Sequence, residues 1–200
     1  MSKKLYYRYG AMNSGKSTSL LQAAHNYEER GQKAIIAKPT IDTKDERVSS
    51  RLGVTREVDM HVNPDTDVFK EFVHLSAQSL IEHDRKVDCL IVDEAQFLTR
   101  EQVNGLFMIA VKCDVPVLAY GIRSDFQGNA FPGSMRLLEI AHSLEEMKTI
   151  CRCGKKALFN GRKIGGEYVR SGGQVAIDDG SIEYESLCGD CYLKYVGPLT

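Results

Sequence analysis

The stretch that decides the fold is Gly10-Ala11-Met12-Asn13-Ser14-Gly15-Lys16-Ser17. It matches the pattern G-x-x-x-x-G-K-S of a phosphate-binding P-loop. The apolar run before it, at 5–9, predicts a buried strand, and the run after it, at 17–29, has apolar residues at helical spacing. Strand, glycine loop and helix follow in the order that the motif requires, which favours a nucleotide site over a chance glycine loop.

The residue types of this loop suit a nucleoside triphosphate with its magnesium ion. Gly10 and Gly15 let successive backbone N–H groups turn towards phosphate oxygens, and the start of the helix adds further N–H groups. Lys16 can reach the β- and γ-phosphates, and the Ser17 hydroxyl can bind Mg²⁺. We therefore predict that residues 10–17 bind ATP and Mg²⁺.

Composition narrows the class of protein. The chain has 200 residues, of which 42% are hydrophobic, and its formal net charge is −1. This length predicts one compact domain with a small appendage. The near-neutral charge argues against a general nucleic-acid binder. The chain lacks an apolar run of about 18 residues and an apolar signal segment at its start, so we expect a cytoplasmic protein without a membrane contact.

The order of predicted elements gives the fold class. Strands are predicted at 5–9, 33–38, 89–92, 115–120 and 147–150. Helices are predicted at 17–29, 64–83, 100–112 and 134–141. The second helix has Asn63-Pro64 as its predicted start, and Thr99 with Gln102 forms a capping-box pattern before the third. Strands that alternate with helices indicate an α/β domain with a mainly parallel sheet, whose ligands bind at the carboxyl ends of the strands.

Two stretches of the chain predict loops. Residues 40–64 are polar and crowded with charge, so they indicate a surface loop, either functional or simply solvated. Residues 121–132 contain glycine and follow a predicted strand. Because the carboxyl ends of parallel strands meet at one sheet edge, we expect this second loop to lie beside the P-loop.

Two carboxylates follow a predicted buried strand. Asp93 and Glu94 come directly after the apolar run at 89–92, which is the form of a Walker B strand. Asp93 would then face the Mg²⁺ beside Ser17, through water. Glu94, just past the strand end, could accept a proton from an attacking hydroxyl or water. The alternative interpretation is an exposed acidic turn.

Four of the six cysteines form two close pairs. Cys151 and Cys153 are separated by one residue, and Cys188 and Cys191 by two. Four thiolates together suit a structural zinc ion, although the first spacing is tighter than usual. Disulfides and free thiols are the alternatives. The segment between the pairs is glycine-rich, so it is either a loop tied at its base by the metal, which could fold over a small substrate, or a disordered insertion.

Taken together, these motifs resemble a known family. The motifs are G-x-M-x-S-G-K-S, DEAQF at 93–97, YGIRSDF at 120–126, and the cysteine pairs around a glycine-rich loop. They are similar to those of the zinc-containing, type II thymidine kinases, in the bacterial or phage variety, along essentially the whole chain. The chain departs from many relatives in its first cysteine spacing and in having Asp179-Gly180 where some have Gly-Gly.

The resemblance implies a fold and an activity. The fold is a RecA-like P-loop domain, at 1–145, and a small zinc-binding domain with a lasso-like substrate loop, at 146–200. The activity is transfer of the ATP γ-phosphoryl group to the 5′-hydroxyl of thymidine, giving dTMP for nucleotide salvage and DNA synthesis, with deoxyuridine as a further acceptor. Family traits also imply a cytoplasmic homotetramer that is inhibited by dTTP and binds no nucleic acid.

The resemblance also implies roles for residues. Glu94 matches the catalytic base and Asp93 the Mg²⁺ aspartate. The implied nucleotide-binding residues are Gly10, Ala11, Met12, Asn13, Ser14, Gly15, Lys16, Ser17, Asp93, Glu94, Ala95 and Gln96. The implied nucleoside-pocket residues are Met12, Phe97, Ile122, Phe126, Phe131, Val175, Ile177 and Tyr184. The implied zinc ligands are Cys151, Cys153, Cys188 and Cys191. Arg123 and Arg162 match basic residues near the phosphates.

Three alternatives to this function stay open at this point. A nucleic-acid-stimulated P-loop ATPase would explain the Asp-Glu-Ala-Gln sequence at 93–96, but such helicases need two RecA-like domains and this chain has the length of one. A non-catalytic ATP switch with a zinc finger is the second. A kinase for a different nucleoside is the third.

Overall fold

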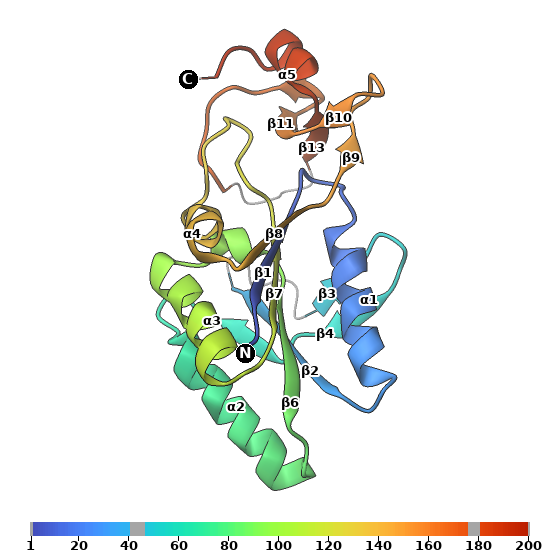
Figure 1. Ribbon diagram of the computed structural model, residues 1–200. Helices are drawn as coiled ribbons and strands as arrows, with labels where there is room; N and C mark the ends of the chain where they lie inside the picture. Colours follow the sequence, from blue (N-terminus) through green and yellow to red (C-terminus); the bar gives the residue numbers. More distant parts are fainter. Residues whose placement is uncertain (1, 41–46, 176–180, 200) are drawn as a thin grey trace.

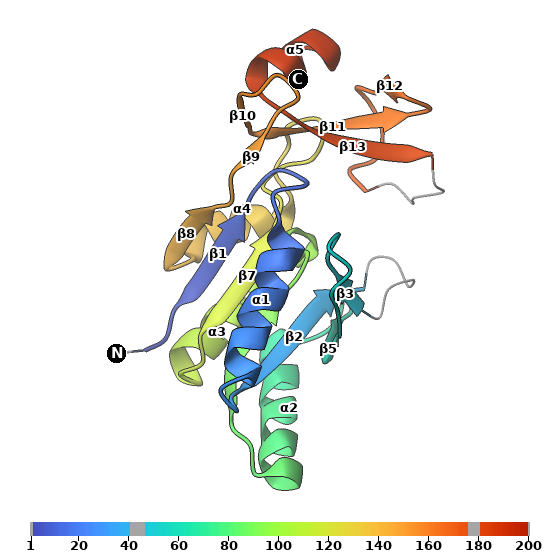
Figure 2. The ribbon, with the colours of Figure 1, turned by 90° about the vertical axis from the view of Figure 1, so that its right-hand side faces the viewer.

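The computed structural model describes residues 2–40, 47–175 and 181–199 (Figures 1 and 2). Ile177, Asp179 and Gly180 lie outside the described residues, so the predictions for them are not addressed below. Of the described helices, none has the length and apolarity that a membrane crossing requires.

The elements fall into a larger N-terminal part and a C-terminal lobe, a name we use for residues 149–199. The N-terminal part contains β1 (Leu5–Tyr9), α1 (Lys16–Glu28), β2 (Lys33–Pro39), β3 (Arg47–Ser49), β4 (Thr55–Glu57), β5 (Met60–Val62), α2 (Val68–His83), β6 (Val87–Val92), the 3₁₀-helix η1 (Ala95–Phe97), α3 (Arg100–Lys112), β7 (Val117–Gly121), α4 (Pro132–Ile140) and β8 (Ser143–Glu146). The C-terminal lobe contains β9 (Thr149–Ile150), β10 (Lys156–Ala157), β11 (Phe159–Ile164), β12 (Glu167–Tyr168), β13 (Ile182–Leu187) and α5 (Gly189–Tyr195).

A six-stranded parallel sheet forms the centre of the N-terminal part. Its strand order is β5-β2-β6-β7-β1-β8, and every pairing is parallel. Helices cover both faces, with α1 packed on one and α2 and α3 on the other (Figure 1). The carboxyl ends of the strands face the C-terminal lobe (Figure 2). The predicted α/β class with a mainly parallel sheet is therefore confirmed.

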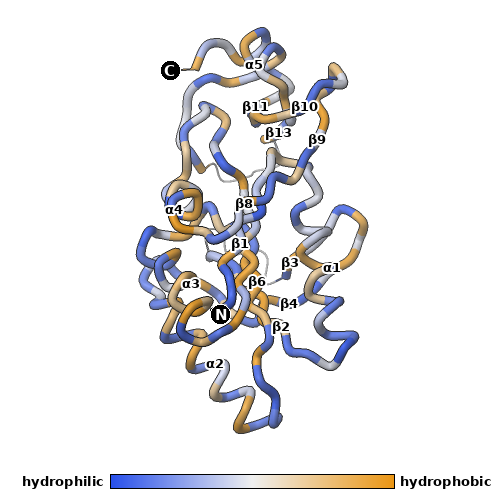
Figure 3. The backbone as a smooth tube through the Cα atoms, viewed as in Figure 1, coloured by the Kyte–Doolittle hydropathy of each residue, from blue (hydrophilic) through white to orange (hydrophobic). Residues whose placement is uncertain are grey.

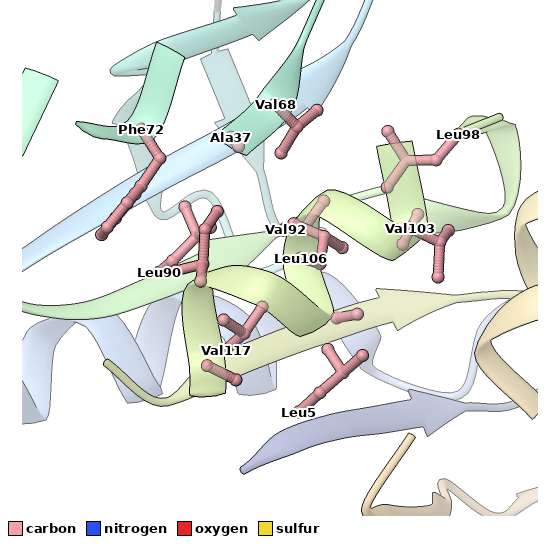
Figure 4. Close-up of a cluster of buried hydrophobic side chains, with 14 of the residues drawn as sticks. Leu5, Ala37, Val68, Phe72, Leu90, Val92, Leu98, Val103, Leu106 and Val117 are labelled. Atoms are coloured by element: carbon pink, nitrogen blue, oxygen red, sulfur yellow. The ribbon is translucent and has the colours of Figure 1, made fainter. Parts of the chain in front are cut away.

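The core follows from the continuous apolar runs of the central strands, which are buried on both faces as parallel strands require. The strands β2, β6 and β7 carry most of the apolar colour within the sheet (Figure 3). Leu90 and Val92 of β6 point towards α2 and α3, where they meet Leu106 and Phe72 (Figure 4). Burial of these side chains is the main favourable contribution to folding.

Replacement of Leu106 by alanine is expected to lower the free energy of unfolding by about 2–5 kcal/mol, because it leaves a cavity in this core. Leu106 is fully buried, at 1% exposure. Denaturant unfolding of the variant measures the loss. The matched control is Leu80→Ala on exposed α2 surface, which should change stability by only a few tenths of a kcal/mol. Equal losses in the two variants would contradict the assignment of the core.

The prediction of a surface loop at 40–64 is wrong for much of that range. β3 and β4 form an antiparallel pair, and β5 joins the edge of the main sheet beside β2. Single apolar residues among the charges explain this, since Val48, Met60 and Val62 are buried. Isolated apolar positions give too weak an alternation to predict strands.

Of the two helix starts predicted from capping patterns, that of α3 is confirmed and that of α2 is wrong. The capping box of Thr99 and Gln102 is present at the start of α3, with both of its hydrogen bonds. The start of α2 is a correction, because its N-cap is Asp67, whose carboxylate accepts the Lys70 N–H at 3.1 Å. Asn63 and Pro64 lie before it, where Asn63 closes a turn with Thr66. Two competing cap residues close together in sequence made the boundary ambiguous.

The strand predicted at 147–150 is also corrected. The last strand of the main sheet is β8, at Ser143–Glu146, and β9 pairs instead with β10 in the C-terminal lobe. β8 is an edge strand with a polar sequence, which apolar patterning does not detect. The segment between the cysteine pairs is likewise more ordered than a loop, since β11, β12 and β13 form an antiparallel sheet.

Candidate active site

A cavity of about 1020 Å³ opens at the carboxyl ends of the strands, below the C-terminal lobe. Its walls come from the P-loop and the start of α1, the end of β2, the turn between β3 and β4, the segment after β6, the loop after β7 and the C-terminal lobe. This is the sheet edge at which ligands of parallel α/β folds bind. The volume lies at the upper end of the range for small-molecule pockets, which is about 300–1,000 Å³.

The P-loop takes the shape that its glycines allow. The Gly10 N–H donates to the Gly121 carbonyl at 3.3 Å, and a side chain at Gly10 would collide with the Met147 carbonyl. Gly15 has φ +77°, a left-handed conformation that favours glycine. Gly15 is also the N-cap of α1 and has no side chain to cap it, so N–H groups of the first turn remain available to an anion.

Six of the eight P-loop residues, Met12 to Ser17, line the cavity, whereas Gly10 and Ala11 lie outside its lining. The ammonium group of Lys16 donates to the Ala11 carbonyl at 2.9 Å. Burial lowers the pKa of Lys16, and the negative charges of Glu94 and Asp93 oppose this shift. The lysine of the P-loop and the two carboxylates after β6 therefore act on one another electrostatically.

Asp93 and Glu94 directly follow the buried strand β6, at the edge of the cavity. Asp93 is 6% exposed, and its N–H donates to the Ala37 carbonyl of β2 at 2.9 Å. Glu94 lines the cavity and has φ +49°. Such a conformation is unfavourable for a residue other than glycine, and it is typical of functional sites. Asp93 and Ala95 are buried and do not line the cavity.

Burial, with Glu94 as a second cause, raises the pKa of Asp93 to about 7. In the unfolded chain an aspartate ionises near pH 4. Between these values the folded protein holds the extra proton, so the contribution of Asp93 to the free energy of unfolding falls as the pH rises. A nearby magnesium ion would reverse this preference by stabilising the carboxylate.

We therefore expect Asp93→Asn to gain stability relative to the wild type, by about 1–2 kcal/mol, when the pH rises from 5.5 to 8 in magnesium-free buffer. Asparagine does not titrate, so only the wild type loses the contribution of residue 93 over this range, whereas groups common to both proteins cancel in the difference. Urea unfolding at the two pH values measures the difference. A stability difference that is the same at both values would contradict the raised pKa.

Gln96 connects Glu94 to the segment that follows the neighbouring strand β7. It is 1% exposed, and its Nε2 donates to Glu94 Oε2 at 2.5 Å. Its Oε1 accepts the Ile122 N–H at 3.2 Å, and a side chain at Gly121 would lie 2.7 Å from that same oxygen. The amide thus fixes the Glu94 carboxylate relative to Ile122. The need for glycine at 121 follows from this close approach.

The predicted nucleoside-pocket residues within the described chain all line the cavity. They are Met12, Phe97, Ile122, Phe126, Phe131, Val175 and Tyr184. Phe97 and Phe131 pack edge to face, with ring centroids 5.4 Å apart. These side chains make one end of the cavity apolar and aromatic, whereas the P-loop end is polar.

Arg162 lies at the aromatic end. Its guanidinium stacks over Phe126, 3.8 Å from the ring centroid, and donates to the Tyr184 hydroxyl and to the carbonyls of Gly173 and Gln174. Arg162 thereby holds the segment before Val175 over the cavity. The resemblance had placed it near the phosphates together with Arg123, which does not line this cavity.

Sequence reasoning missed several polar residues of the cavity wall, among them Lys38, Arg51, Asp125, Asn160 and Gln174. Asp125 could have been found, because it stands in the YGIRSDF motif. Its carboxylate accepts the Gln174 amide at 3.0 Å and the N–H groups of Gln127 and Asn129. The others lie in segments without a distinctive local pattern.

The two cysteine pairs meet in the C-terminal lobe. The four Sγ atoms of Cys151, Cys153, Cys188 and Cys191 lie within 4.8 Å of one another, and all six cysteines of the chain are free of disulfides. Zinc with four thiolates at about 2.3 Å places the sulfurs roughly 3.8 Å apart, so the cluster fits a tetrahedral site. With four ligands the site is closed, which suits a structural ion.

Comparisons with known proteins identify relatives of this chain. A family model described as "Thymidine kinase" matches residues 3–192. A thymidine kinase of Enterobacteria phage T4 is 46% identical over 187 residues, which cover 92% of each chain. A thymidine kinase of Idiomarina loihiensis is 45% identical over 200 residues, covering 96% of this chain and 97% of that one. Among solved structures, the Legionella pneumophila ATPase DotB aligns with 78% of this chain and 44% of its own, at 15% identity and a TM-score of 0.39, a similarity too low to support an inference.

Proposed function

This chain belongs to the thymidine kinase family, and we propose that its cavity transfers the γ-phosphoryl group of ATP to the 5′-hydroxyl of thymidine. The observation that supports this most strongly is the arrangement within one cavity. A P-loop forms the polar end, aromatic side chains form the other end, and the strained Glu94 lines the same cavity. A phosphate donor could occupy the polar end and the base of a nucleoside the aromatic end, with the Glu94 carboxylate in the same cavity.

Glu94 is the proposed base. Its carboxylate takes the proton of the 5′-hydroxyl while that oxygen bonds to the γ-phosphorus. The bond between the γ-phosphorus and the β–γ bridging oxygen breaks, and ADP leaves with the negative charge. Lys16 and the P-loop N–H groups offset the charge on the phosphate oxygens. Gln96 holds the carboxylate in one orientation during the transfer.

Ser17 and Asp93 are the proposed residues around Mg²⁺. When bound, this ion supplies positive charge at the β- and γ-phosphate oxygens. The donor types fit, since a hydroxyl and a carboxylate are ligands that magnesium prefers. Burial of Asp93 beside Glu94 supports the assignment, because a cation there would relieve the repulsion between the two carboxylates.

The aromatic end is the proposed thymidine pocket. Its apolar walls suit the base and its methyl group, and backbone groups near Val175 would read the base edge, together with Ile177 in the part of the chain not described. Tyr184 would lie near the sugar. Deoxyuridine lacks only the methyl group, so we propose it as a second acceptor. The loss of one methyl group costs little in an apolar pocket.

Further traits of the family belong to this proposal. We include the division into a nucleotide-binding domain at 1–145 and a zinc-binding domain at 146–200, a homotetramer, feedback inhibition by dTTP, and nucleotide salvage in the cytoplasm. The cysteine cluster supports the zinc ion. Membership of the family supports the others.

The test is Mg·ATP turnover with a panel of acceptors. We expect rapid formation of a 5′-monophosphate from thymidine and deoxyuridine, and little from deoxycytidine or purine nucleosides. Single-stranded DNA, added to a parallel reaction without nucleoside, should not stimulate ADP release. ATP hydrolysis that responds to DNA alone would contradict the proposal and favour a nucleic-acid-stimulated ATPase.

A further inference from the structure

Side chains of the C-terminal lobe form hydrogen bonds with the backbone of the P-loop. The Met12 N–H donates to Asn160 Oδ1 at 2.7 Å, and the Ser186 hydroxyl donates to the Met12 carbonyl. Thr149 of β9 donates to the Asn13 carbonyl at 3.3 Å. Both backbone groups of Met12 are therefore bonded to side chains that lie far away in the sequence.

Asn160 and Ser186 lie side by side in the sheet of the C-terminal lobe. They are direct partners in the antiparallel pairing of β11 with β13, so their side chains leave the same face of that sheet. Asn160 is 2% exposed, and its Nδ2 donates to the Ser124 carbonyl at 3.1 Å. One buried amide thus joins three segments, namely the P-loop, the loop after β7 and β11.

The hydrogen-bond partners of Asn160 and Ser186 indicate the role of these two side chains. A residue that only stabilised the C-terminal lobe would bond within it, whereas both partners of the Asn160 amide lie outside the lobe. Met12 is the residue that both substrate sites share. It belongs to the P-loop, and it also lines the cavity together with the aromatic residues of the proposed thymidine pocket.

We propose that Asn160, assisted by Ser186, is a positioning residue that fixes Met12 and thereby sets the P-loop against the nucleoside pocket. The thymidine part of this inference rests on the proposed function. Loss of the Asn160 amide leaves the Met12 N–H and the Ser124 carbonyl without partners, which lets the P-loop shift relative to both ends of the cavity. Binding of the two substrates is therefore weakened together.

The test uses Asn160→Ala and Ser186→Ala, with Asn26→Ala on the exposed face of α1 as the matched control. We expect Asn160→Ala to raise the KM values for ATP and for thymidine, and the Kd for ADP in calorimetry, each about tenfold. Ser186→Ala should raise all three about threefold. Zinc content should match the wild type, and Asn26→Ala should behave as the wild type throughout.

Unchanged KM and Kd values in a folded, zinc-loaded Asn160→Ala protein would overturn the proposal, because a purely structural role moves the melting temperature and not substrate binding. If Asn160→Ala does not fold, Ser186→Ala decides by the same criteria. ADP binding does not depend on the acceptor. A wild type that binds ADP but does not phosphorylate thymidine would therefore refute the proposed function while the ADP measurements still test the role of Asn160.

Discussion

Replacement of Glu94 by glutamine is expected to lower the turnover of thymidine by about three orders of magnitude. The amide keeps the size of the side chain but cannot accept the proton of the 5′-hydroxyl. Glu94 lines the cavity beside the P-loop but is not part of it, so ATP should bind within about threefold of its wild-type affinity. Steady-state kinetics measure the turnover of thymidine. Calorimetry with ADP, which occupies the same P-loop without reacting, measures nucleotide affinity.

The control for this variant is Glu82→Gln, which makes the same chemical change at an exposed side chain of α2. It should leave both turnover and nucleotide affinity unchanged. Glu94→Gln with near-normal turnover would remove Glu94 from the role of base. Loss of ADP binding in parallel with turnover would instead mean that Glu94 serves the nucleotide site as a whole.

Replacement of Cys191 by serine is expected to abolish stable zinc binding and to unfold much of the C-terminal lobe. The small core of that lobe consists of three of the four cysteines and a few apolar residues, namely Cys151, Cys188 and Cys191 with Ala157, Leu187, Tyr192 and Val196. Such a core buries too little apolar surface to fold without the metal, so zinc affinity is folding free energy here. Zinc content should fall from about one ion per chain to a small fraction, with loss of solubility and activity.

Cys113→Ser is the matched control, because Cys113 is a half-buried thiol at the end of α3, outside the cluster. It should retain zinc and activity. Metal analysis with far-ultraviolet circular dichroism makes the comparison. A metal-free Cys191→Ser protein that is folded and active would contradict the structural zinc site.

Local patterns explain why part of this structure could be predicted from sequence. The P-loop needs glycine at fixed positions because its turn admits nothing larger at Gly10, and the motif therefore survives in the sequence as spacing. The capping box of Thr99 is likewise a short-range hydrogen-bond pattern. The carboxylates Asp93 and Glu94 could be placed because a continuous apolar run fixes the end of β6.

What failed depends on residues far apart in the chain. β8 is polar and becomes a strand only because β1 offers it an edge. β5 extends the other edge of the sheet in the same way, through its pairing with β2. The contact of Asn160 with Met12 joins positions 148 residues apart, and no local pattern marks it. Tertiary hydrogen bonds of this kind position the walls of the cavity. Sequence reasoning therefore found the motifs of the site but missed many of the residues that hold those motifs in place.

The most direct test of the central claim is the stoichiometry of products from Mg·ATP with thymidine, beside 5′-deoxythymidine, which lacks the attacking hydroxyl. The account predicts one dTMP for each ADP with thymidine, and neither product above background with 5′-deoxythymidine. ADP and inorganic phosphate released at the same rate with both compounds would show that water is the acceptor, and would contradict the assignment of this cavity to thymidine phosphorylation.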